Sequence, residues 1–146
     1  MVRILEDVKI NVKIKLSVLW ICLMFFYLYN DVLSFFQPGT IEELITGDIG
    51  GMQMTQLFLF GAAVLMAIPI FMVFLSLALP AKVNRWVNIV VGIFHVVVLV
   101  ATLIVPGDLW AYYAFYMLLE AVFIIIIVWH AWKWPTRDVS SKIENS

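Results

Sequence analysis

The chain has 146 residues, of which 64% are hydrophobic and 13% charged, and its formal net charge is −1. Soluble domains average roughly 45–50% apolar and about 25% charged residues, so this composition excludes an ordinary soluble domain and indicates a membrane protein. The near-zero net charge argues against a nucleic-acid partner, and the single cysteine, Cys22, excludes an intrachain disulfide.

Four long apolar segments follow one another along the chain. We predict membrane spans over residues 16–36, 55–79, 87–105 and 109–129. Each is close to the ~20 residues that cross the hydrocarbon core as a helix, and four strands are too few to close a membrane barrel. The predicted fold is therefore all-α: one integral membrane four-helix bundle over residues 1–146, with residues 130–146 as a tail. The first span is too long for a signal peptide, so we expect it to be uncleaved.

The basic residues predict the orientation of these spans. They fall into three clusters: Arg3, Lys9, Lys13 and Lys15; Lys82 and Arg85; and Lys133, Arg137 and Lys142. Four crossings bring all three clusters to one side, whereas the other two connections carry only acids. The positive-inside rule then predicts a multi-pass protein of the cell (inner) membrane with both termini cytoplasmic.

Residues near the predicted span ends agree with this arrangement. Aromatic residues are enriched at membrane interfaces. We assign Trp20, Trp86, Trp129, Trp132 and Trp134 to the cytoplasmic face, and Trp110, Tyr112 and Tyr113 to the outer face. Residues 8–16 alternate between apolar and polar side chains, but a lone strand would leave its backbone unpaired. We therefore expect an interfacial helix or a cytoplasmic extension of the first span.

The first outer loop is the only sizeable one, and its pattern predicts a short helix. Thr40 and Glu43 have the spacing of a capping box, and Gly47 is a typical C-terminal stop, which favours a helix over residues 41–46. This loop is either a lid over the membrane domain or an ordered connector. We favour the connector, because most loops of this length only connect.

Two ionisable residues lie deep in the predicted spans. Glu120 is about 16 Å from the outer end of the fourth span, and His95 is about 15 Å from the same face in the third. A charged carboxylate at that depth costs about 2.5–3.5 kcal/mol even on insertion scales. Either Glu120 remains a neutral acid that donates a hydrogen bond, or a protonated His95 pairs with it. We expect the two side chains to lie within hydrogen-bonding reach, directly or through one water.

Other polar residues share helical faces with this pair. Tyr116 precedes Glu120 by four residues and Thr102 follows His95 by seven, while Asp31 and Tyr27 lie in the outer half of the first span. The candidate proton or ligand site comprises Glu120, His95, Asp31, Tyr116, Tyr27 and Thr102. We expect these residues to line a polar cleft that opens outward, above an apolar cytoplasmic half.

Each candidate also has a purely structural interpretation. Asp31 is shallow enough to be hydrated at the interface, and membrane histidines often serve as hydrogen-bonded links between helices. No phosphate-binding glycine loop, H-E-x-x-H, G-x-S-x-G or C-x-x-C motif is present in the sequence. We therefore expect no cofactor and no metal, and we assign no catalytic residue.

Three stretches of the chain resemble a known family. They are YLYNDVLSFFQPG at residues 27–39, IPIFM at 68–72 and NRWVN at 84–88. Together they resemble a family of small four-span prokaryotic membrane proteins known only as a domain of unknown function. The likeness extends over residues 16–134. It implies the topology and a prokaryotic origin, and it implies no activity or ligand.

Three functions fit these observations. The first is a small transporter-like or solute-binding protein with a protonatable intramembrane site, acting as a homo-oligomer because four helices are few for an enclosed pathway. The second is a structural or accessory membrane subunit whose buried polar groups serve packing. The third, less favoured, is a membrane enzyme acting on a lipid or quinone.

A water-connected cleft favours transport, a dry and mutually satisfied polar cluster favours the accessory role, and a lateral opening favours the enzyme. Membrane lipids, a small solute or lipid ligand and further copies of the chain are the expected partners.

Overall fold

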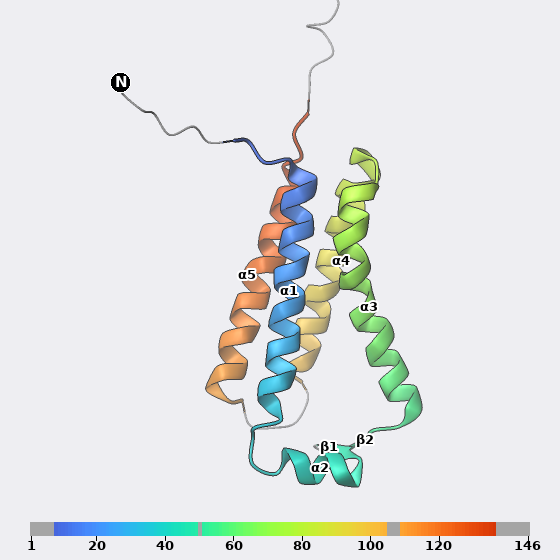
Figure 1. Ribbon diagram of the computed structural model, residues 1–146, viewed down its shortest axis with the longest axis vertical. Helices are drawn as coiled ribbons and strands as arrows, with labels where there is room; N and C mark the ends of the chain where they lie inside the picture. The colour runs from blue at the N-terminus through green and yellow to red at the C-terminus, as the bar shows by residue number, and fades with distance from the viewer. Residues whose placement is uncertain (1–7, 50, 105–108, 137–146) are drawn as a thin grey trace, which may run out of the picture.

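The computed structural model describes residues 8–49, 51–104 and 109–136 (Figure 1). In chain order its elements are α1 (Val12–Ser34), α2 (Thr40–Thr46), β1 (Asp48–Ile49), β2 (Met52–Gln53), α3 (Gln56–Ala78), α4 (Ala81–Thr102) and α5 (Ala111–Trp132). The four long helices have 22 or 23 residues each and are apolar enough to cross a membrane. The prediction of four helical candidate spans is confirmed.

The long helices run along the long axis of the molecule (Figure 1). Close contacts join α1 to α3, α1 to α5 and α4 to α5, whereas α3 and α4 touch over a smaller area. The start of α1, the turn between α3 and α4 and the end of α5 lie together at one end of the molecule (Figure 1). The helix α2 and the two short strands lie at the opposite end, which we term the loop end.

The described basic side chains gather at the first of these ends, which we term the basic end. They belong to the segment before α1, the start of α1, the start of α4 and the residue after α5: Lys9, Lys13, Lys15, Lys82, Arg85 and Lys133. Most of the hydrophobic core also lies toward this end. Its fully buried members include Leu16, Trp20, Ile127 and Ala131.

The helix ends differ from the predicted span ends at several points. The helix α1 begins at Val12 because the side chain of Asn11 caps it and accepts a hydrogen bond from the Lys13 amide at 2.9 Å. Residues 8–11 have no regular structure, so the alternating segment is in part an extension of the first span. At the other end of the chain, α5 runs to Trp132, three residues beyond its predicted end.

The predicted third span, from residue 87, covers only part of the helix that contains it. The helix α4 begins six residues earlier, at Ala81, immediately after the extended N-cap residue Pro80. The φ of −65° at Pro80 is the value that its ring imposes. Of the polar residues that follow it, Asn84 is buried whereas Lys82 is exposed. The predicted end of this span at residue 105 lies outside the described residues.

The short helix of the first loop is confirmed, but its predicted capping box is wrong. The N-cap is Gly39, which has a φ of 90° and makes no side-chain hydrogen bond, so Thr40 is already the first helical residue. The helix ends at Gly47 with a φ of 71°, in the left-handed region that glycine adopts at low cost.

The sequence did not predict the hairpin that follows α2. Strands β1 and β2 pair antiparallel, with Asp48 opposite Gln53 and Ile49 opposite Met52. Each strand has only two residues, which is too short for an alternating pattern to be recognised. The two paired strands lie between α2 and α3.

The contact between α4 and α5 depends on the absence of a side chain at Gly92. A Cβ atom at this position would lie 2.6 Å from Val128 Cγ2, well inside van der Waals contact. Valine is stiff at χ1, so its methyl group cannot easily rotate away.

We expect Gly92→Ala to lower the free energy of unfolding by about 1–3 kcal/mol, because the added methyl group forces α4 and α5 apart. Thermal unfolding of the purified protein in detergent measures this loss. Gly61→Ala in α3 is the matched control, since a Cβ there meets nothing within 4 Å. The double variant Gly92→Ala/Val128→Ala should recover stability. Equal unfolding midpoints for the two single variants would contradict the close-contact explanation.

Candidate functional site

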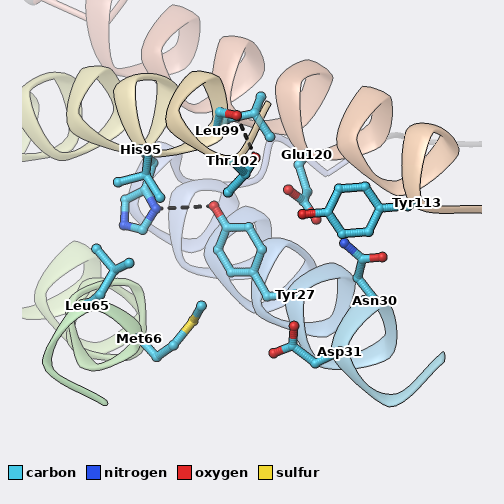
Figure 2. Close-up of a pocket in the computed structure, with 11 residues that line it drawn as sticks. Tyr27, Asn30, Asp31, Leu65, Met66, His95, Leu99, Thr102, Tyr113 and Glu120 are labelled. Atoms are coloured by element: carbon cyan, nitrogen blue, oxygen red, sulfur yellow. Dashed lines mark hydrogen bonds between the residues drawn. The ribbon is translucent and has the colours of Figure 1, made fainter. Parts of the chain in front are cut away.

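All four long helices contribute side chains to one pocket of about 130 Å³ (Figure 2). The lining residues are Tyr27, Asn30 and Asp31 from α1; Leu65 and Met66 from α3; His95, Val98, Leu99 and Thr102 from α4; and Tyr113 and Glu120 from α5. The volume has room for several water molecules or a ligand of a few heavy atoms. Asp31, Thr102 and Tyr113 lie near the helix ends at the loop end, whereas His95 and Glu120 lie deeper along their helices.

Five of the six predicted site residues line this pocket. His95 and Thr102 line it from α4, and Glu120 lines it from α5. Asp31 and Tyr27 reach the same pocket from α1. The expected convergence of these residues is therefore present in the structure.

Tyr116 is the exception, because it does not line the pocket. Its ring packs edge to face on Phe26 and Phe115, with centroid distances of 6.2 and 5.9 Å. Four residues along a helix leave Tyr116 about 40° from Glu120, whereas seven residues leave Tyr113 only about 20° away. Tyr113 consequently takes the position that the prediction gave to Tyr116.

The histidine of the pocket is held by aromatic neighbours. Its Nδ1 atom forms a hydrogen bond of 3.1 Å with the Tyr27 hydroxyl, and the two rings are stacked at 5.9 Å. Trp20 meets the His95 ring edge-on at 5.8 Å. The side-chain hydrogen bond of His95 within the described residues is therefore to Tyr27, and a direct bond to Glu120 is not made. A link through one water stays a prediction.

Three residues of the pocket each carry a buried polar atom that lacks a partner within the described part of the chain. These atoms are Asn30 Oδ1, His95 Nε2 and Glu120 Oε1. Their side chains are 7%, 1% and 4% exposed, so bulk solvent does not reach them freely. An unsatisfied buried polar group costs about 1–3 kcal/mol. The pocket therefore combines a cavity with unused hydrogen-bonding capacity on three helices.

A second set of buried polar residues lies closer to the basic end, and its hydrogen bonds are made. Trp20 Nε1 donates to Asn88 Oδ1 at 2.7 Å, and the Ser76 hydroxyl donates to the same oxygen at 3.3 Å. Asn88 Nδ2 donates to the carbonyl and side-chain oxygens of Asn84 at 2.9 and 2.6 Å. Asn84 Nδ2 in turn donates to the Ser76 carbonyl at 2.5 Å. We term Trp20, Ser76, Asn84 and Asn88 the asparagine cluster.

The asparagine cluster corrects two predictions. The half of the protein toward the basic end is not apolar inside, because Asn84, Asn88 and Ser76 are fully buried there. Trp20 is not an interfacial residue either, since its ring is also fully buried and serves as a hydrogen-bond donor in the core. A tryptophan that lies one helical turn inside an apolar segment can face the membrane interface or the protein core, and the local sequence does not distinguish the two.

A sequence signal for this cluster exists and was missed. The polar or small residues of α4 follow one face at spacings of four, four, three and seven: Asn84, Asn88, Gly92, His95 and Thr102. This periodicity marks the face that packs against the other helices. The prediction that began the third span at residue 87 left Asn84 outside the membrane and hid the pattern. Asn30 was missed as well, although it lies three residues from Tyr27 on one face of α1.

The fold defines a small helical protein with four segments able to span a membrane and a polar pocket between them. The chain belongs to DUF6326, a family of unknown function, whose family model matches residues 2–141. This confirms the resemblance to an uncharacterised domain family. No curated protein and no solved structure matches the chain significantly.

The asparagine cluster and the pocket should respond differently to loss of an amide. We expect Asn88→Ala to lower the free energy of unfolding by about 1–3 kcal/mol, because Trp20 and Ser76 lose their common acceptor. Asn30→Ala is the matched control, since Asn30 is also buried but its Oδ1 atom has no partner in the described chain. Chemical or thermal unfolding in detergent compares the two. Losses of equal size would show that the two clusters are not energetically distinct.

Proposed function

We propose that this protein binds a small solute at a protonatable pocket within the membrane, as a transporter-like or solute-sensing protein. The observation that carries the proposal is the pocket formed by all four long helices, around which Asn30, His95 and Glu120 keep unpartnered buried atoms. Ionisable residues are costly at membrane depth and most often mark sites of function. The pocket is also small, which suits a solute of a few heavy atoms.

The proposed topology is a four-helix bundle in the cell membrane of a prokaryote, with both termini cytoplasmic. It rests on the gathering of the described basic side chains at one end of the molecule (Figure 1). The positive-inside rule assigns that end to the cytoplasm. The loop end, with α2 and the acidic residues Glu42, Glu43 and Asp48, then faces outward.

In this orientation the pocket would take its solute from outside. Asp31 is exposed and lies near the loop end, whereas His95 and Glu120 are buried at the pocket's deep side. Below them the asparagine cluster and the apolar core are closely packed. A single copy therefore suits binding from one side, and passage across the membrane would involve rearrangement or a homo-oligomer.

The accessory role is the main alternative, and the asparagine cluster is its strongest support. The residues of that cluster are fully buried and hydrogen-bonded to one another, as expected of polar residues that serve helix packing. The pocket differs, because its buried polar atoms remain unpaired. The solute-binding role is favoured for this reason over the accessory role, and both over a lipid- or quinone-linked enzyme.

The topology predicts which introduced thiols are reachable from outside the cell. In a background without Cys22, Thr46→Cys should react with a membrane-impermeant thiol reagent on intact cells, because Thr46 is exposed on α2. Ser141→Cys, beyond the described residues, should react only after the cells are opened. Labelling of Ser141→Cys on intact cells would reverse the proposed orientation.

Glu120→Gln tests the protonatable site directly. The glutamine keeps the size and hydrogen-bonding ability of the side chain but cannot ionise, so the protein should fold normally and lose the pH dependence of solute binding. The measurement is binding of methylammonium, acetate and acetamide to the protein in lipid nanodiscs at several pH values. Glu43→Gln, on the exposed surface of α2, is the matched control.

Two results would contradict the proposed function. If Glu120→Gln unfolds in detergent while Glu43→Gln does not, Glu120 is a structural residue. If the wild-type protein and Glu120→Gln show the same pH dependence, the site is not protonatable at Glu120. In either case the accessory role replaces the proposal.

A further inference from the structure

We infer that the solute taken by this pocket is a small primary ammonium cation with a short apolar tail, which enters in exchange for a proton. The inference rests on the proposed solute site and specifies its ligand class. It depends on the charge of the lining, on the chemistry of the two sides of the pocket and on its volume.

The ionisable side chains of the pocket favour a cation. Two acids, Asp31 and Glu120, line it, and the chain contains no lysine or arginine between residues 16 and 81 or between residues 86 and 132. His95 is the only side chain of the lining that can carry a positive charge. An anion would therefore meet like charge, which opposes binding, whereas a cation supplies the missing counter-charge.

The acids are not merely clustered, because buried and unpartnered polar side chains accompany them. The Glu120 carboxyl group is 4% exposed and its Oε1 atom lacks a partner in the described chain. His95, on a different helix, is 1% exposed and its Nε2 atom also lacks one. Figure 2 draws the carboxyl groups of Asp31 and Glu120 on the same side of the Tyr27 ring, and both residues line the pocket.

The other residues of the lining favour an organic cation over a metal ion. Within the described residues, no group of three or more histidine, cysteine, aspartate or glutamate side chains could hold a metal. Apolar side chains from α3 and α4 form a large part of the lining: Leu65, Met66, Val98 and Leu99. An alkyl tail can pack on these side chains while the ammonium group faces the acids of α1 and α5. The rings of Tyr27 and Tyr113 add surfaces that attract a cation.

An ammonium group also fits the hydrogen-bonding capacity of the site. It carries three N–H donors, whereas carboxylate and amide oxygens accept hydrogen bonds. A quaternary ammonium has no such donor, and a volume of about 130 Å³ limits the tail to a few carbons. Methylammonium to butylammonium is the range that these constraints define.

Charge balance couples entry of the cation to release of a proton. Before the cation binds, the Glu120 carboxyl group holds its proton, because a bare carboxylate is costly inside the membrane. When the ammonium ion enters, that O–H bond breaks, the carboxylate pairs with the cation and the proton leaves to water. The titratable groups that face the site are Tyr27 and Asp31 on α1, His95 on α4 and Tyr113 and Glu120 on α5; α3 contributes only Leu65 and Met66.

Isothermal titration of the full-length protein in phosphatidylcholine nanodiscs tests the inference. The probes are propylammonium, its neutral analogue 1-propanol, the anion propionate, tetramethylammonium and sodium, with empty nanodiscs as the blank. We expect saturable binding of propylammonium alone. Titration in two buffers of different ionisation enthalpy should show release of about one proton per bound cation, from the exchange described above.

Matched variants separate the pocket acids from other acids. Glu120→Gln and Asp31→Asn should each weaken propylammonium binding at least tenfold, and Glu120→Gln should also abolish proton release. Glu43→Gln on α2 and Asp48→Asn on β1 also replace a carboxyl group by an amide, but at the loop end and outside the pocket. They should leave propylammonium binding unchanged. Wild-type affinity in Glu120→Gln would overturn the inference.

The failure of this inference and the failure of the proposed function give different results. If 1-propanol or propionate binds with pH dependence and propylammonium does not, the ligand class is wrong and the solute site remains. If sodium binds as well as propylammonium, the site is a general cation site and the organic ligand is wrong. If no probe binds to the folded protein, both the ligand class and the solute site are wrong.

Discussion

Two hydrogen bonds between α1 and α4 hold the interior of this protein together. Trp20 donates a hydrogen bond to Asn88, and the Tyr27 hydroxyl forms one with His95. In each pair the two residues are 68 positions apart in the sequence. The paired residues are thus seven apart on each helix, and α1 and α4 run in the same direction (Figure 1). The helices in closest contact are α1 with α3 and α5, and α4 with α5, so these side chains bridge the middle of the assembly. In a membrane such bonds matter because no water can replace them.

The hydrogen bonds Trp20–Asn88 and Tyr27–His95 have different surroundings. At the Asn88 bridge, Ser76 and Asn84 supply the remaining hydrogen bonds, and the site is closed. At the His95 bridge the second ring nitrogen has no partner in the described chain, and a pocket opens beside it. The same kind of hydrogen bond between α1 and α4 therefore contributes to packing near the basic end and forms one wall of a polar pocket nearer the loop end.

Much of this arrangement follows from sequence, and the exceptions have identifiable causes. Span number, the depth of Glu120 and His95 and the convergence of Asp31 and Tyr27 follow from hydropathy, helical rise and helical periodicity. The position of Tyr116 was wrong because Tyr116 and Tyr113 lie about 60° apart around α5, on opposite sides of Glu120, and only Tyr113 faces the pocket. The asparagine cluster was missed because its members come from three helices, and hydropathy does not show that Trp20, Ser76 and the α4 asparagines meet.

A pocket with unpaired buried atoms is a local departure from the rule that interior polar groups are satisfied. At about 1–3 kcal/mol for each unsatisfied group, three such atoms are a large cost for a protein of this size. The cost is tolerable because the asparagine cluster, the tight α4–α5 contact at Gly92 and the apolar core lie together in the adjacent half of the molecule. Departures of this kind are expected at functional sites rather than at random positions. The unpaired atoms of Asn30, His95 and Glu120 are therefore the observation on which the proposed solute site rests, because all three lie in one pocket.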